Sequence, residues 1–87
     1  MSVIYIDLLT FARYPSIIIA KEYGTPCSQN IEMNENFGKT IADIAAANNI
    51  TNIKIQSGKE YAQKYINDIK EAYLLYYNKD NLEIEVI

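Results

Sequence analysis

The hydrophobic pattern changes its period several times along the chain, and each change marks a new predicted element. Alternating apolar and polar residues are typical of strands with one buried face, whereas apolar residues three and four apart are typical of an amphipathic helix. Helical spacing predicts helices over residues 38–49 and 57–78. Alternating or continuous apolar runs predict strands over residues 3–9, 15–23, 30–35, 50–56 and 82–87. Together these elements make one domain over residues 1–87.

The order of the elements predicts how they pack. Residues 10–14 form a short connection between the first two strands, which indicates an antiparallel hairpin. Each of the last two strands follows a helix, and successive right-handed crossovers in one direction place both helices on the same face of a sheet. The strand pattern agrees, because Ile53 and Ile55 share one face while Lys54 and Gln56 share the other. The second face would therefore be uncovered.

This succession of three antiparallel strands and two further helix–strand units resembles the ribonuclease H-like superfold in its minimal form. The resemblance covers nearly the whole chain and implies a two-layer α/β fold. Its five-stranded mixed sheet would have the order 3-2-1-4-5, with two helices on one face. The run from residue 38 to 73 also looks like a segment of small ribosomal proteins that share this topology. Those proteins are basic, whereas this chain has a net charge of -3, so RNA binding is not implied.

Nucleases of that superfold hold two divalent metals with a cluster of carboxylates, and the resemblance implies Asp7 and Asp43 as candidates. Gln56 and Ser57 stand where the family has a further acid, and neither supplies the negative charge that a hard cation prefers. The simpler interpretation places Asp7 on the open sheet face beside Lys54 or Gln56, where a cross-strand charge pair contributes about 0.2–1 kcal/mol. A divalent-metal nuclease therefore remains an alternative.

Composition narrows the chemistry further. The chain has one cysteine, Cys27, and no histidine, which argues against zinc sites, internal disulfides and histidine-based catalysis. We expect no enzyme, metal or cofactor, and a cytoplasmic location. An acidic balance disfavours nucleic acid as a partner, because such binding depends on cations that neutralise phosphates. No apolar run approaches the length of a membrane span, so we expect no membrane partner.

Eight tyrosines are the unusual feature of the composition. On the second predicted helix, Tyr65, Tyr73 and Tyr76 lie on the apolar stripe and are expected in the core. Tyrosine is favoured at protein interfaces because it buries a large area at low entropic cost. Tyrosines away from the stripe and on the open sheet face are therefore candidates for contact. The predicted interaction surface comprises Tyr5, Asp7, Lys54, Gln56, Tyr61 and Tyr77.

The turn before the second helix is a second candidate site. Ser57 precedes Glu60 by three residues, which predicts a capping box at the start of the helix. Helix N-termini attract anions, so Ser57, Gly58 and Lys59 could hold a small anionic ligand. A capped connection explains the same residues without a ligand.

These patterns predict a small, non-catalytic interaction module that binds another protein and also associates with itself. A phage or viral inhibitor or accessory protein has this size and charge, and the abundance of Ile, Asn, Lys and Tyr indicates an AT-rich genome. The alternatives are an anion-binding module at Gly58 and a nuclease that uses Asp7 and Asp43.

Overall fold

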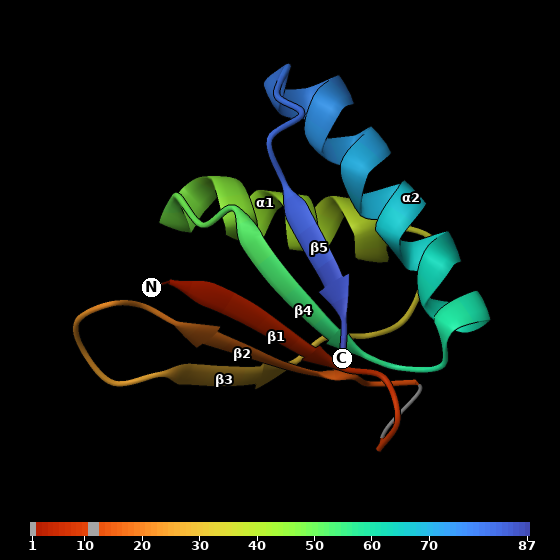
Figure 1. The fold of residues 1–87 in the computed structure, drawn as a ribbon, viewed down its shortest axis with the longest axis horizontal. Coiled ribbons are helices and arrows are strands. Elements are labelled where there is room, and N and C mark those ends of the chain that lie inside the picture. Colours follow the sequence, from red (N-terminus) through yellow and green to blue (C-terminus); the bar gives the residue numbers. More distant parts are fainter. Residues whose placement is uncertain (1, 11–12) are drawn as a thin grey trace.

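A computed structural model of the protein describes residues 2–10 and 13–87 (Figure 1). Over this part of the chain, one mixed sheet has the strand order β3-β2-β1-β4-β5. β1 lies at its centre, antiparallel to β2 and parallel to β4. The helices are α1 (Phe37–Asn48) and α2 (Lys59–Tyr77). The strands are β1 (Val3–Asp7), β2 (Ser16–Ala20), β3 (Cys27–Asn30), β4 (Asn52–Gln56) and β5 (Glu83–Val86). The predicted α/β sheet and its strand order are confirmed.

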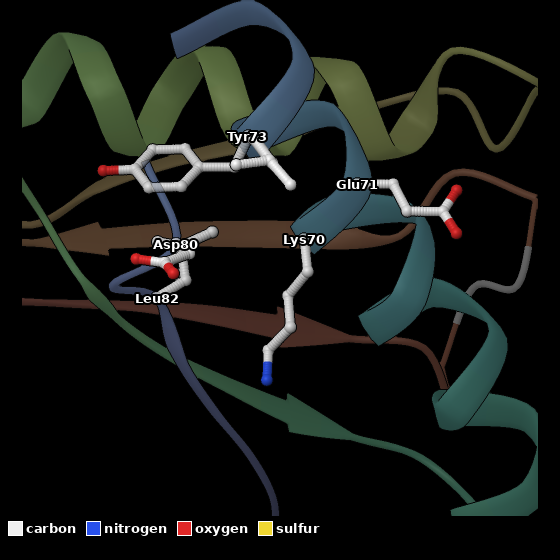
Figure 2. A pocket seen from close by; sticks show the side chains of 6 residues that line it. Lys70, Glu71, Tyr73, Asp80 and Leu82 are labelled. Atoms are coloured by element: carbon white, nitrogen blue, oxygen red, sulfur yellow. The ribbon is translucent and has the colours of Figure 1, made fainter. Parts of the chain in front are cut away.

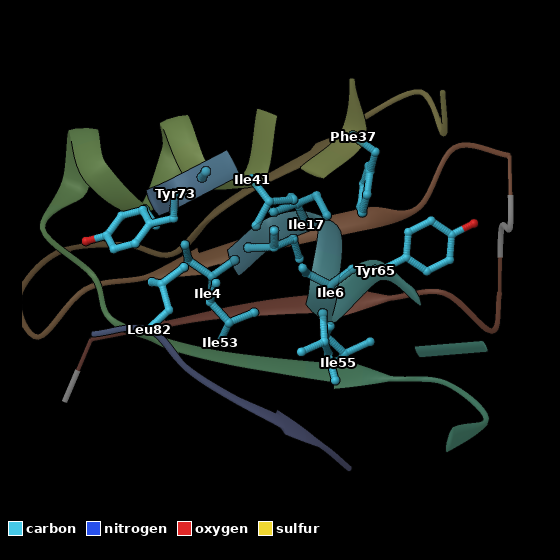
Figure 3. Packing of buried hydrophobic residues seen from close by; sticks show 14 of the residues in the cluster. Ile4, Ile6, Ile17, Phe37, Ile41, Ile53, Ile55, Tyr65, Tyr73 and Leu82 are labelled. Carbon is cyan, nitrogen blue, oxygen red and sulfur yellow. The ribbon is translucent and has the colours of Figure 1, made fainter. Parts of the chain in front are cut away.

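The core lies between the sheet and the two helices (Figure 3). Ile4 and Ile6 of β1 and Ile55 of β4 are buried, and all three belong to the same cluster as Ile41 of α1 and Ile69 of α2. Because successive strand residues point to opposite faces, the intervening residues of these strands face away from the helices. Both helices therefore cover one face of the sheet, as predicted, and the other face is open.

The two helices approach each other closely at Gly38. A Cβ atom at this position would lie 2.8 Å from the backbone carbonyl carbon of Asp68 on α2, which is closer than real side chains come. Beside this contact, the rings of Phe37 and Tyr65 meet edge to face with their centroids 5.8 Å apart. The contact between α1 and α2 thus depends on the absence of a side chain at residue 38.

Asparagines end both helices, but the predicted capping box is wrong. Asn49 and Asn78 have the left-handed backbone conformation, with φ values of 54° and 53°, that commonly follows a helix. At the start of α2 the N-cap is Gly58, with no side-chain capping bond. The Ser57 hydroxyl lies one residue too early in the chain and instead donates a hydrogen bond to the Gly58 carbonyl at 3.2 Å.

The third strand begins earlier than the predicted range of residues 30–35. Cys27 pairs with Ile19, so β3 runs over residues that show no apolar alternation and are all exposed. Beyond the strand, the Ile31 N–H still donates to the Pro15 carbonyl at 3.1 Å, and the Met33 N–H to the Arg13 carbonyl at 2.8 Å. Regular pairing ends there because proline has no N–H and cannot donate a hydrogen bond to the opposite strand. The position of β3 is decided by its pairing with β2 rather than by its own pattern.

Candidate functional site

The open face of the sheet carries side chains in rows that cross the strands. Tyr5 of β1 has Ile18 of β2 as its partner on one side and Lys54 of β4 on the other. In the next row, Asp7 lies between Ser16 and Gln56. Directly opposed residues on one face are close enough to interact, so each row forms a continuous strip.

These rows border a shallow depression of about 230 Å³. The depression brings together four residues of the predicted interaction surface, Tyr5, Asp7, Lys54 and Gln56. Ile18 and Ile87 complete its apolar part, and both are exposed, at 38% and 56% of their surface. Ile87 was missed by the sequence prediction, although it has the same strand parity as Glu83 and Glu85 and therefore belongs to the open face.

Asp7 closes the turn that follows β1. Its carboxylate accepts hydrogen bonds from the Leu9 N–H at 2.9 Å, the Thr10 N–H at 3.2 Å and the Thr10 hydroxyl at 2.7 Å. These bonds, above all that from the Thr10 hydroxyl, lower the pKa of Asp7. Asp7 lies on the open face as predicted, but its strand partner is Gln56, and its charge is held by the turn rather than by Lys54.

Asp43 joins the two helices. Its carboxylate accepts a 2.5 Å hydrogen bond from the Tyr77 hydroxyl and forms a 2.9 Å ion pair with Lys39. The bond from Tyr77, followed by that from Lys39, lowers the pKa of Asp43, and the same Tyr77–Asp43 bond raises the pKa of Tyr77. Asp43 thus has a structural role in the helix layer.

The two candidate metal ligands are not brought together. Asp7 lies on the open face of the sheet, whereas Asp43 lies between the helices on the covered side. Across residues 2–10 and 13–87, no group of three acidic, cysteine or histidine side chains is placed to hold a metal ion. The arrangement therefore does not resemble the carboxylate cluster of a two-metal nuclease.

The remaining predicted tyrosines lie in the helix layer. Tyr61 is 47% exposed, and its hydroxyl accepts a 3.3 Å hydrogen bond from Tyr65, an interaction that raises the pKa of Tyr65 to about 12. Tyr77 is half-buried beside Asp43. Tyr76 was predicted in the core but is 55% exposed, because the last turn of α2 packs Tyr77 rather than Tyr76 against the core cluster. There the Lys39 ammonium lies 5.0 Å from the centroid of the Tyr76 ring.

The turn before α2 shows local bonding only. The Ser57 hydroxyl is directed at the Gly58 carbonyl, and that carbonyl also accepts the N–H of Ala62 at 2.9 Å. The side chain of Lys59 lies outside what the structure describes. Nothing in the described part of this turn favours an anion over a simple strand–helix connection.

No protein-family model matches the chain, and no curated protein matches it in sequence. Within the described residues, neither helix has the length and apolarity required to cross a membrane. The depression on the open face is the site at which most residues of the predicted interaction surface come together.

Proposed function

We propose that the protein is a non-catalytic interaction module that binds another protein through the open face of its sheet. The observation that supports the proposal most directly is the exposure of Tyr5, Ile18 and Ile87 around one depression. Lys54 and Gln56 border the same apolar surface and supply a polar rim. An apolar centre with a polar rim is typical of protein interfaces.

The energetics favour a partner on this face. Apolar surface removed from water contributes about 25 cal/mol per Å², so covering Tyr5 and Ile18 would be favourable. The strands that carry these residues are held by pairing on both sides and by a buried core beneath. The open face is therefore a rigid surface, and binding to it would lose little conformational entropy.

Binding to a purified partner tests this proposal. A protein retained from an extract of the natural host is identified, purified and titrated against three forms of the chain. We expect Tyr5→Arg combined with Ile18→Arg to weaken binding by at least about tenfold, because two buried charges would oppose the interface. Tyr23→Arg is the matched control, since Tyr23 is 85% exposed in the connection between β2 and β3. Equal binding of the double variant would contradict a role for the open face.

Self-association through the same face is part of the proposal, because two copies can bury the depression against each other. Sedimentation velocity over a concentration series checks it. We expect the sedimentation coefficient to rise with concentration for the wild type but not for the variant with Tyr5→Arg and Ile18→Arg. A monomer at every concentration would remove self-association while leaving the titration above as the test of heterologous binding.

A further inference from the structure

The free edge of β5 offers backbone groups for a further strand. The Glu83 N–H donates to the Thr51 carbonyl at 2.7 Å, and the Ile87 N–H donates to the Ile55 carbonyl at 2.9 Å. Alternate residues of a strand bond to the same neighbour, so the odd-numbered residues of β5 are directed at β4. The backbone N–H and C=O groups of Ile84 and Val86 are then directed away from β4, along the free edge.

The side chains of β5 differ sharply between the two faces. Glu83 and Glu85 are exposed on the open face, whereas Ile84 and Val86 are partly buried on the helix side. A strand added to this edge would place its own residues alternately opposite the two sets. Opposite charges favour directly opposed pairs, so basic residues suit the positions beside the glutamates and apolar residues suit the other face.

A groove lies on the helix side of the same edge, where β5 begins (Figure 2). Its volume is about 190 Å³, and its apolar lining comes from Tyr73 and Leu74 of α2 and from Leu82. Leu74 is 53% exposed, while Lys70 and Asp80 form a charged rim. An apolar side chain of an added strand would enter this groove and cover Leu74.

We propose that the edge of β5 binds an extended segment of a partner protein in which basic and apolar residues alternate. The segment pairs with the backbone of Ile84 and Val86, places its basic residues beside Glu83 and Glu85, and directs an apolar residue at Leu74. The backbone edge of β5 and the groove at Leu74 lie outside the depression, although Glu83 and Glu85 share the open face with it. The inference does not depend on the function proposed for the depression.

A second copy of the chain is a poorer occupant of this edge. Antiparallel pairing of two β5 strands about Ile84 would set Glu83 of one copy opposite Glu85 of the other, and like charges in that position are destabilising. The opposite edge of the sheet gives a contrast, because β3 carries neither charged nor large apolar residues over Cys27–Asn30. The alternation of acidic and apolar residues along β5 therefore favours this edge over β3, and it favours a partner segment with basic residues.

Synthetic peptides test the inference directly. The probe is a fluorescent peptide of about nine residues in which lysine and valine alternate, a length that matches an ordinary strand. One control has the same composition with the lysines and valines in separate blocks, and another has glutamate in place of lysine. By fluorescence anisotropy we expect each control to bind at least about tenfold more weakly than the alternating peptide. Equal binding of the blocked peptide would overturn the proposal.

Paired charge reversals locate the bound peptide. Glu83→Lys with Glu85→Lys should abolish most of the binding, whereas Glu22→Lys with Glu32→Lys changes the net charge equally at exposed positions far from β5 and should have little effect. Equal losses in the two variants would show non-specific attraction and overturn the proposal. Amide chemical shifts give a second readout, because changes must centre on Ile84 and Val86. Tyr5→Ser with Ile18→Ser removes apolar surface from the depression without adding charge and should leave peptide binding intact, which distinguishes the edge of β5 from the depression.

Discussion

Neighbouring residues of β1 experience two different environments. Ile6 is 1% exposed and packs beneath the helices, while Tyr5, one position earlier, is 37% exposed on the open face. On the covered side the side chains must fill a shared volume, so their size and shape are tightly constrained. On the open side, the main constraint is contact between side chains of neighbouring strands, so the type of side chain is less restricted. Stability should therefore depend on one face of the strand, and recognition on the other.

The largest expected effect is on the covered face. Ile6→Ala removes a fully buried side chain and leaves a cavity beneath α1 and α2, which should lower the free energy of unfolding by about 2–5 kcal/mol. Urea denaturation followed by circular dichroism measures this loss. A change below about 1 kcal/mol would mean that the covered face is not close-packed around β1.

The second effect tests the close approach of the helices. Gly38→Ala places a Cβ atom 2.8 Å from the Asp68 backbone, so α1 and α2 must separate. Overpacking of this kind should lower the free energy of unfolding by about 1–3 kcal/mol. Gly58→Ala is the control, because nothing lies within 4 Å of a Cβ atom at that position. Equal stability of the two variants would contradict the tight helix contact.

The third effect is smaller and depends on pH. Tyr77→Phe removes the hydrogen bond that lowers the pKa of Asp43 below 3.8 and raises the pKa of Tyr77 above 10.0. The carboxylate contribution is lost as pH falls through the lowered pKa of Asp43, and the phenol contribution is lost as pH rises through the raised pKa of Tyr77. The stability difference from wild type should therefore be greatest between these limits. Denaturant midpoints measured from pH 2 to pH 11 check this, and parallel curves would contradict it.

The smallest expected effect is at Tyr5. Tyr5→Ser removes cross-strand contacts with Ile18 and Lys54 and should change the free energy of unfolding by less than about 1 kcal/mol. The urea measurement used for Ile6→Ala also gives the loss in free energy of unfolding for Tyr5→Ser, so the losses on the two faces can be compared directly. A loss as large as that of Ile6→Ala would mean that the open face also carries the stability of the domain.

The sequence predicted most of the fold because its alternation is local. Ile53 and Ile55 opposite Lys54 and Gln56 are enough to orient β4, and the order of helices and strands then limits the sheet to few arrangements. The third strand was misplaced because Cys27–Asn30 has no such pattern. Its position follows from pairing with Ile17 and Ile19, which is a contact between segments rather than a property of either.

The candidate site was predictable only where strand parity decides it. Tyr5, Asp7, Lys54 and Gln56 lie in neighbouring strands, so a shared face brings them together. The contact between Asp43 and Tyr77 joins residues 34 positions apart and depends on how the two helices cross. The hydrophobic pattern of each helix does not indicate how the two helices cross. The predicted surface therefore combined residues of the open sheet face with tyrosines of the helix layer.

The central position of β1 has a consequence for how the chain assembles. β1 and β2 are close in the sequence, so their pairing closes a short loop, whereas Ile4 also pairs with Ile53, which is synthesised much later. A chain that has formed only the pairing of β1 with β2 would expose one unpaired edge of an apolar strand to neighbouring chains. Removal of β1 would also divide the sheet into a hairpin and a separate pair of parallel strands, so a truncation of this segment should destroy the fold.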